Sequence, residues 1–181
     1  ERGPMANVVL AIDMLRGFLE ESNPLFCEAA SRSIIPRVQR LLAREMSRGS
    51  PLCFIMDSHD PDDLEFRMFP RHCVAGTEEA ELVPELAGFP GERLRKKRYS
   101  GFFGTPLEQR LQVLQPDKLI VVGVCTDICV LHTVAGARNR DYTVEVPRDC
   151  VASFDERMHR FALEHMDKVL GAKITISMEE K

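Results

Sequence analysis

The sequence lacks the features that mark several large classes of protein. No apolar run approaches the ~20 residues that a membrane-spanning helix needs, so we expect no membrane span. Basic residues are not in excess: 24 Lys and Arg against 28 Asp and Glu give a net charge of −4. This balance argues against a nucleic-acid partner and against binding to an anionic membrane. No Gly-x-Gly-x-x-Gly turn follows an apolar run, which disfavours a nucleotide-binding protein.

Cysteine is present, but not in a pattern that indicates a disulfide framework or a thiolate metal site. The six cysteines include no Cys-x-x-Cys pair, and several lie in apolar runs. A buried thiol behaves as a small hydrophobe, so we expect reduced thiols and a cytoplasmic location. The 181 residues are 44% hydrophobic and 29% charged, which is typical of a soluble globular protein. We expect a single domain over residues 5–181, with residues 1–4, ahead of Met5, left from cloning.

Short, branched, apolar segments alternate with helical patterns along the chain. Strands buried on both faces have this composition, and their alternation with helices implies parallel pairing. We therefore predict an α/β protein with three layers, α/β/α, around a mostly parallel sheet of about five or six strands. The predicted strands are 7–13, 51–56, 118–124 and 142–146, with weaker ones ending near residue 96 and covering 173–176; the predicted helices are 31–48, 127–139, 153–170 and one opened by a capping box at 105–108.

Reactive side chains follow four of the predicted strands, where ligands of such sheets bind. Asp13 ends the first strand, and Asp57 and His59 follow the second. Lys96 ends a later strand, and Cys129 follows the apolar strand 118–124. We expect Cys129 in the first turn of a helix, where free N–H groups and the helix dipole favour a thiolate. Beside a thiol, Asp13 is placed to accept its proton and pass it to a leaving amine.

Each of these residues also has an ordinary structural interpretation. Cys129 fits a buried packing residue, and Cys125, nearer the strand, fits that role better. Asp13 fits a helix-capping or loop acid. Lys96 belongs to a cationic run, and we interpret its neighbours Lys97 and Arg98 as solvent-exposed.

A metal site is a further possibility in the long aperiodic segment 57–77, which is typical of a functional loop. Asp57, His59, Glu65 and His72 offer carboxylate and imidazole ligands. Nitrogen and oxygen donors without thiolate suit zinc, iron or manganese. The Asp-x-His spacing alone also occurs by chance. The remaining histidines lie on helical patterns, where ordinary surface or core positions are expected.

With these residues together, the chain resembles the isochorismatase-like cysteine hydrolases from about residue 7 to 176. Ala11-Ile12-Asp13 followed by Phe18 is similar to the family's first-strand aspartate and downstream aromatic residue. The segment 96–105, KKRYSGFFGT, is similar to the catalytic-lysine motif, and 123–130, GVCTDICV, to the nucleophile motif.

The resemblance implies a catalytic triad of Cys129, Asp13 and Lys96. It also implies a cis peptide bond between Val124 and Cys125. This bond would orient the Cys125 N–H so that, with the Cys129 N–H, it forms the oxyanion hole.

The loop 57–73 resembles that of the nicotinamidase/pyrazinamidase branch. Asp57-x-His59, an acid at position 65 and the piece 69–73, FPRHC, carry this likeness. It implies a divalent metal, zinc foremost with iron or manganese as alternatives, held by Asp57, His59, Glu65 and His72. Phe18 and Phe69 would flank the substrate ring. Glu65, Phe69 and Arg16 differ from the residues of some relatives.

The resemblance then implies hydrolysis of nicotinamide to nicotinate and ammonia through a thioester, a reaction of NAD salvage, by a homo-oligomer. One alternative is another small amide, ureido or carbamoyl substrate. Another is an isochorismatase-type vinyl-ether hydrolase, which needs neither a nucleophilic cysteine nor a metal loop. A third, from a different class, is a non-catalytic metal-binding module, in which Cys129 would be unreactive.

Overall fold

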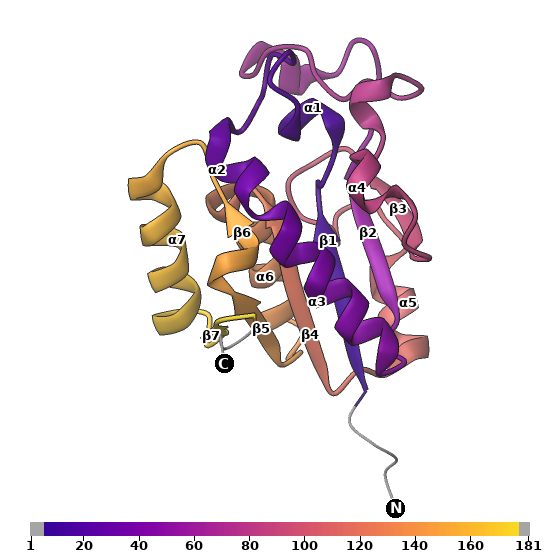
Figure 1. The fold of residues 1–181 in the computed structure, drawn as a ribbon, viewed down its shortest axis with the longest axis vertical. Helices are drawn as coiled ribbons and strands as arrows, with labels where there is room; N and C mark the ends of the chain where they lie inside the picture. The colour runs from indigo at the N-terminus through magenta and orange to yellow at the C-terminus, as the bar shows by residue number, and fades with distance from the viewer. Residues whose placement is uncertain (1–5, 178–181) are drawn as a thin grey trace, which may run out of the picture.

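The structure, a computed structural model, describes residues 6–177, and its centre is a single parallel sheet (Figure 1). The strand order is β3-β2-β1-β4-β5-β7, with β6 paired to β4, and every strand pair is parallel. The predicted fold class is therefore confirmed, with seven strands in the described residues rather than five or six. The strands are β1 Asn7–Ile12, β2 Leu52–Asp57, β3 Glu92–Lys96, β4 Lys118–Val124, β5 Val144–Pro147, β6 Val151–Ala152 and β7 Lys173–Thr175.

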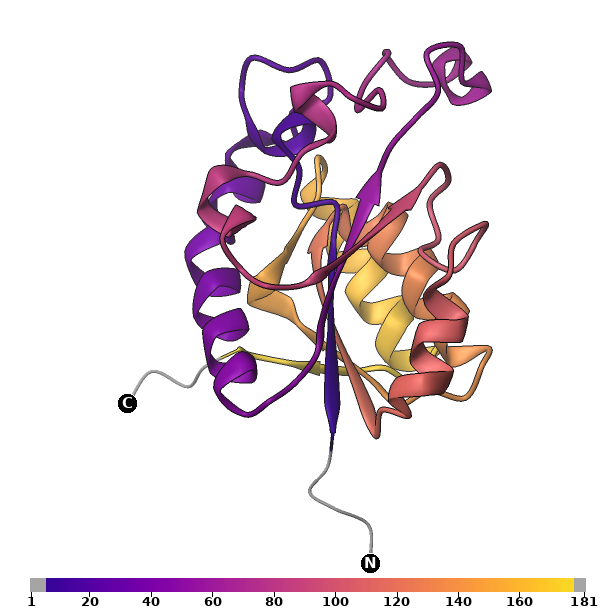
Figure 2. The same cartoon turned by 90° about the vertical axis from the view of Figure 1, so that its right-hand side faces the viewer.

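Helices cover both faces of the sheet (Figure 2). None of those in residues 6–177 is long and apolar enough to cross a membrane. One layer contains α1 Arg16–Leu19, α2 Glu28–Ser33, α3 Ile35–Ser47 and α4 Pro84–Ala87; the other contains α5 Leu107–Leu114, α6 Leu131–Arg138 and α7 Glu156–Lys168; the shorter turns are η1 Leu64–Arg67, η2 Glu78–Ala80, η3 Thr126–Val130 and η4 Arg148–Cys150.

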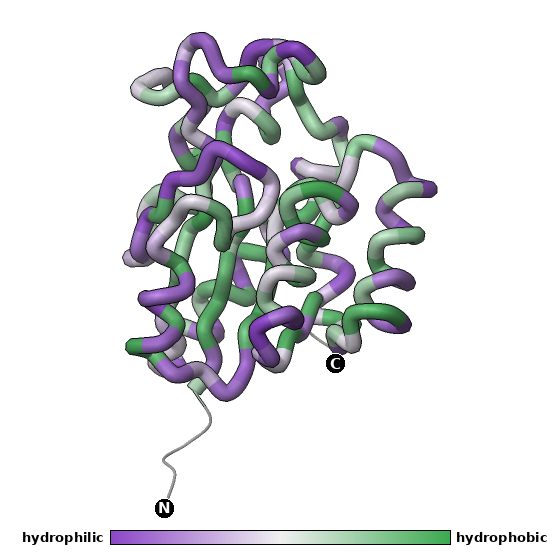
Figure 3. Tube along the Cα trace, turned by 180° about the vertical axis from the view of Figure 1, so that it is seen from behind, coloured by the Kyte–Doolittle hydropathy of each residue, from purple (hydrophilic) through white to green (hydrophobic). Residues whose placement is uncertain are grey.

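The apolar strands pack against both layers because successive side chains of a strand point to opposite faces. In β1, Val9 and Ala11 join the core under α3, whereas Val8, Leu10 and Ile12 join the core under α5, α6 and α7. This arrangement explains why the strand is continuously apolar rather than alternating. The hydropathy colouring shows the same separation, with hydrophobic strands inside and hydrophilic segments on the surface (Figure 3).

Two helix boundaries differ from the prediction. The helix predicted over 31–48 is two helices, α2 and α3, which meet at Ile34. The helix predicted from Ser153 begins at Glu156, because the Asp155 carboxylate accepts hydrogen bonds from two backbone N–H groups of its first turn. The Ser153 hydroxyl instead bonds to the Asp127 carboxylate beside the carboxyl end of β4.

Gly123 lets β4 approach β1 closely just before the candidate site. Its φ of +120° is rarely adopted by residues with side chains, and a Cβ there would lie 2.0 Å from the Ile12 carbonyl oxygen. The chain then passes through Val124 and Cys125 to the turn η3. Glycine at this position therefore sets the path of the segment that carries Cys129.

Candidate active site

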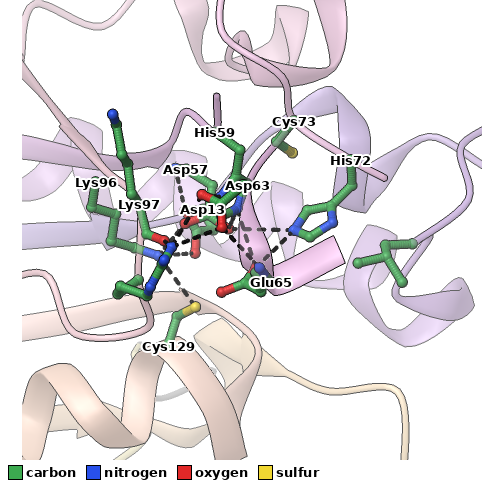
Figure 4. A network of polar contacts seen from close by, with 12 residues as sticks. Asp13, Asp57, His59, Asp63, Glu65, His72, Cys73, Lys96, Lys97 and Cys129 are labelled. Carbon is green, nitrogen blue, oxygen red and sulfur yellow. Dashed lines mark hydrogen bonds and ion pairs between the residues drawn. The ribbon is translucent and has the colours of Figure 1, made fainter. Parts of the chain in front are cut away.

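Four reactive side chains meet at the carboxyl edge of the sheet (Figure 4). Asp13 follows β1, Asp57 ends β2, Lys96 ends β3 and Cys129 lies in η3 after β4. All four are buried, with exposed fractions of 1%, 4%, 1% and 7%. The parallel topology thus brings together residues that are far apart in the sequence, as the strand-end rule predicted.

Lys96 lies at the centre of this group. Its Nζ is 2.9 Å from Asp13 Oδ2, 2.5 Å from Asp57 Oδ1 and 3.3 Å from Cys129 Sγ. Burial alone would lower the pKa of Lys96, but the two carboxylates outweigh it and raise the pKa well above its usual value. The ammonium is therefore charged, and it links the thiol to both acids.

Asp13 is a carboxylate whose surroundings suit proton transfer. It has a left-handed backbone with φ of 50°, and its Oδ1 accepts a hydrogen bond from the Asp57 N–H at 2.8 Å. Burial and the nearby charge of Asp57 raise the Asp13 pKa to about 6, although Lys96 opposes the shift. A carboxyl group with a pKa near neutrality can both accept and return a proton.

Cys129 lies in a wider turn than predicted. The Val130 N–H bonds to the Cys125 carbonyl at 3.1 Å, so η3 is a π turn that precedes α6 rather than the first turn of an α-helix. Burial raises the pKa of the Cys129 thiol well above its usual value, and Lys96 only partly opposes the shift. Burial therefore opposes the thiolate that the helix position was expected to favour, so the thiol needs a base. Asp13 provides one, since a carboxylate oxygen of Asp13 lies within 4.8 Å of the sulfur.

The peptide bond between Val124 and Cys125 is cis, as the resemblance implies. The Cys125 side chain is buried, and its Sγ lies 3.2 Å from that of Cys27, in the loop before α2. This contact fits the interpretation of Cys125 as a packing cysteine. Nothing in the sequence pointed to Cys27, because the contact joins segments 98 positions apart.

The second cluster consists of Asp57, His59, Glu65 and His72, whose donor atoms all lie within 4.8 Å of one another. Each imidazole donates its Nδ1 hydrogen away from the centre. His72 donates to the Pro70 carbonyl at 2.7 Å, and His59 bonds to an Asp63 carboxylate oxygen at 3.0 Å. Both Nε2 atoms therefore point toward the Asp57 and Glu65 carboxylates.

The donor set of this cluster fits a divalent cation. His59 Nε2 lies 3.2 Å from Glu65 Oε2 and 3.4 Å from Asp57 Oδ2, and His72 Nε2 lies 3.3 Å from Glu65 Oε2. Among the described residues His59 Nε2 is fully buried yet has no hydrogen-bond partner, which leaves its lone pair for a ligand. Two imidazole nitrogens and two carboxylates suit zinc, iron or manganese. Burial would lower the pKa of His59, but the surrounding acids raise it to about 9, so without a cation a proton on Nε2 takes the place that the metal ion would occupy.

A pocket that is partly open to solvent joins the two clusters. Phe18 and Phe69, singled out from the sequence, line it beside Cys129 and His72. Further lining side chains were not predicted: Leu25, Tyr99, Ile128 and Phe154. Phe154 lies two residues after the end of β6, so the strand-end rule would have pointed to it had the two-residue strand β6 been recognised.

Two expectations about charged residues have different outcomes. Lys97 is solvent-exposed as predicted, and pairs with the exposed Asp60. Arg98 is not simply solvated: it donates to both oxygens of the buried Asp63 carboxylate, at 3.0 and 3.1 Å. Arg16 bonds to Glu20 at 2.8 Å and is not among the residues that line the pocket.

The parallel sheet holds a buried thiol, a lysine and a carboxylate at its carboxyl edge, the groups that a cysteine hydrolase needs. The chain belongs to the isochorismatase family: residues 7–178 match the Isochorismatase domain. An uncharacterized isochorismatase family protein, PncA of Bacillus subtilis, is 34% identical over 181 residues, covering 94% of this chain and 99% of the relative. The crystal structure of nicotinamidase/pyrazinamidase PncA from Bacillus subtilis has a TM-score of 0.89 at 35% identity, covering 94% of this chain and 100% of that chain.

Other relatives have different activities in their names. A pyrazinamidase of Pyrococcus horikoshii in complex with zinc has a TM-score of 0.86 at 28% identity, over 94% of this chain and 98% of that chain. An N-carbamoylsarcosine amidase from Thermoplasma acidophilum has a TM-score of 0.87 at 30% identity, over 98% and 99%. A probable inactive nicotinamidase of Arabidopsis thaliana is 31% identical over 91% of this chain and 89% of the relative. The family resemblance is confirmed, and the substrate is a separate question.

Proposed function

We propose that this hydrolase cleaves the C–N bond of a small primary amide, nicotinamide first, through a thioester on Cys129. The observation that carries the proposal is the position of Lys96 Nζ, in contact with Asp13, Asp57 and the Cys129 sulfur beneath an aromatic pocket. Relatives called nicotinamidase or pyrazinamidase support the choice of substrate.

In the first half-reaction the Cys129 sulfur attacks the amide carbonyl carbon while Asp13 takes the thiol proton. The backbone N–H groups of Cys125 and Cys129 hold the oxyanion of the tetrahedral intermediate. The C–N bond then breaks, and Asp13 returns the proton to the leaving nitrogen, which departs as ammonia. Lys96 remains charged throughout and stabilises the negative charges that develop around it.

In the second half-reaction Asp13 removes a proton from water, whose oxygen attacks the thioester carbon. The C–S bond breaks, the proton returns to the sulfur of Cys129, and the acid product leaves. Asp57, His59, Glu65 and His72 would hold a divalent cation; when bound, it supplies a Lewis-acidic contact that fixes the orientation of the substrate.

The pocket wall favours an aromatic amide over the second candidate, a ureido or carbamoyl compound. Phe18, Phe69 and Tyr99 line the pocket, and Phe69 and Tyr99 lie edge to face with ring centres 6.5 Å apart. Such rings bind a flat heteroaromatic ring well. The second candidate is kept because the N-carbamoylsarcosine amidase is similar to this chain over nearly its whole length.

The test is ammonia release from nicotinamide by the purified, zinc-loaded protein, compared with Cys129→Ala. Cys53→Ala is the matched control, because Cys53 is also a buried thiol but packs in the core under α5 and α6. We expect activity in the wild type and the Cys53 variant and none in the Cys129 variant. Activity that survives in Cys129→Ala would exclude the thioester route. No release by the wild type would exclude nicotinamide, and N-carbamoylsarcosine would then be tested in the same assay.

A further inference from the structure

One buried acid beside the histidine–carboxylate cluster has no part in the proposed reaction. The loop after β2 contains three nearby acids, Asp60, Asp62 and Asp63, of which only Asp63 is buried. An uncompensated buried carboxylate is costly, so its contacts must offset the loss of hydration. They come from three directions.

The first two contacts connect Asp63 to two members of the cluster. Asp63 Oδ2 accepts the Nδ1 hydrogen of His59 at 3.0 Å, and Asp63 Oδ1 accepts the backbone N–H of Glu65 at 2.9 Å. The second bond caps the turn η1, which contains Glu65. One carboxylate therefore fixes both the imidazole ring of His59 and the backbone position of Glu65.

The third contact connects the loop to the segment after β3. Arg98 lies just beyond Lys96, and its guanidinium donates to both oxygens of Asp63 and to the Lys97 carbonyl at 2.6 Å. The Asp63 carboxylate thus connects the loop of His59 and Glu65, through Arg98, to the strand that ends at Lys96.

We propose that Asp63, held by Arg98, is the positioning residue of the cation site: it keeps the hydrogen of His59 on Nδ1, so that the Nε2 lone pair faces Asp57 and Glu65. The inference rests on the metal-binding part of the proposed function. Acids that accept the outer N–H of a metal-binding histidine fix its tautomer and ring orientation, and their loss weakens metal binding by about 10–100-fold.

Asp63→Asn tests this role because the amide keeps the shape of the carboxylate but carries two hydrogens. His59 and Glu65 donate to different oxygens of Asp63, so the single amide oxygen of the variant can face only one of them. An amide N–H facing His59 Nδ1 would force the ring hydrogen onto Nε2, toward the cation. Asp60→Asn is the matched control: Asp60 lies in the same loop and pairs with Lys97, but it is 57% exposed along its side chain.

Two quantities are measured on the full chain. Zinc affinity is measured by competition with a chromophoric chelator. The His59 tautomer in the zinc-loaded protein is measured by long-range ¹H–¹⁵N NMR. We expect Asp63→Asn to weaken zinc binding about 10–100-fold, while Asp60→Asn stays within about twofold of the wild type. We also expect the zinc-loaded wild type to carry its His59 hydrogen on Nδ1 and the Asp63 variant to lose that signal, which a loss of stability alone would not cause.

Equal zinc affinity and the same His59 tautomer in both variants would overturn the role of Asp63 and leave the proposed function intact. A wild type that binds no zinc would instead overturn the metal-binding part of that function together with this inference, whatever the amidase assay shows. If Asp63→Asn does not fold, zinc affinity is measured instead for Arg98→Met, with Lys97→Met as its control. We expect several-fold weaker zinc binding in the Arg98 variant only, and equal binding in the two would overturn the proposal.

Discussion

The protein buries carboxylates at both edges of its sheet, and the pKa shifts of these carboxylates differ in direction between the two edges. At the carboxyl edge Asp13 is 1% exposed, and burial and Asp57 raise its pKa to about 6. At the amino edge Glu45, near the end of α3, is also 1% exposed, but its pKa is lowered. Equal solvent exposure thus does not give equal shifts: Asp13 lies deeper in the protein than Glu45, and the two acids have different partners.

The difference lies in the partners of each acid. Burial would raise the pKa of Glu45, but its side chain accepts hydrogen bonds from Asn7 at 3.0 Å and Ser50 at 2.9 Å, and from two arginines. Asp13 instead shares Lys96 with a second carboxylate. Neutral donors and two arginines stabilise the charge of Glu45. Asp13 competes with Asp57 for a single ammonium group, which leaves Asp13 able to exchange a proton. We infer that the first arrangement serves stability and the second serves chemistry.

The largest effect is expected when a positive charge is removed from each edge in turn. Lys96→Met leaves Asp13 and Asp57 buried without a cation, so we expect activity to fall by about 10³-fold or more and stability by about 3–5 kcal/mol. Arg48→Met removes a partner of Glu45 whose side chain is 62% exposed, so we expect unchanged activity and a stability loss below about 1 kcal/mol. Ammonia release and urea unfolding measure the two effects. Similar losses in both variants would remove the distinction between the edges.

A slightly smaller effect is expected from Gly123→Ala. A methyl group there would overlap the Ile12 carbonyl, and the φ of +120° disfavours any side chain. We expect a loss of about 4 kcal/mol in the free energy of unfolding, because backbone atoms of two central strands would have to separate. Gly88→Ala is the control, since nothing lies within 4 Å of a Cβ at that position. Equal unfolding midpoints for the two variants in urea would show that β4 can move away from β1.

The sequence predicted the parts of the molecule that depend on local pattern. The apolar run 118–124 matches β4 residue for residue, and the reactive residues at strand ends do meet. It did not predict the contacts of Asp63 with Arg98 or of Cys27 with Cys125, because these join segments far apart in the chain. Nor could it predict that the pKa of Cys129 is raised, since the helix position favours a thiolate, and burial, Asp13 and Asp57 oppose it only in the folded structure.

Neutralising each acid gives a smaller effect with opposite signs at the two edges. Asp13→Asn removes a charge that burial disfavours, while the amide oxygen can still accept the Asp57 N–H; we expect an inactive protein that is about 1–2 kcal/mol more stable. Glu45→Gln removes a charge that its surroundings favour, and we expect full activity and a loss of about 1–2 kcal/mol. Urea unfolding at pH 7.5 with chelator present measures both. An Asp13 variant less stable than the Glu45 variant would contradict the conclusion that the buried Asp13 charge destabilises the fold.

The smallest effect is the pH dependence of these two differences, which follows from the direction of each pKa shift. The folded-state pKa of Asp13 is raised from 3.8 to about 6, so its destabilising effect is complete above about pH 6 and disappears as the pH falls toward 3.8. The folded-state pKa of Glu45 is lowered from 4.5, so its stabilising effect is complete above pH 4.5 and is lost only as the pH falls through the lowered value. At pH 5 we therefore expect the gain of Asp13→Asn to have shrunk by roughly 1 kcal/mol while the loss of Glu45→Gln is nearly unchanged. Chelator-treated wild type and both variants, unfolded in urea at pH 7.5, 5 and 3.5, give the comparison. If the stability differences of Asp13→Asn and Glu45→Gln from the wild type shrink together between pH 7.5 and 5, the two carboxylates have pKa shifts in the same direction and the comparison fails.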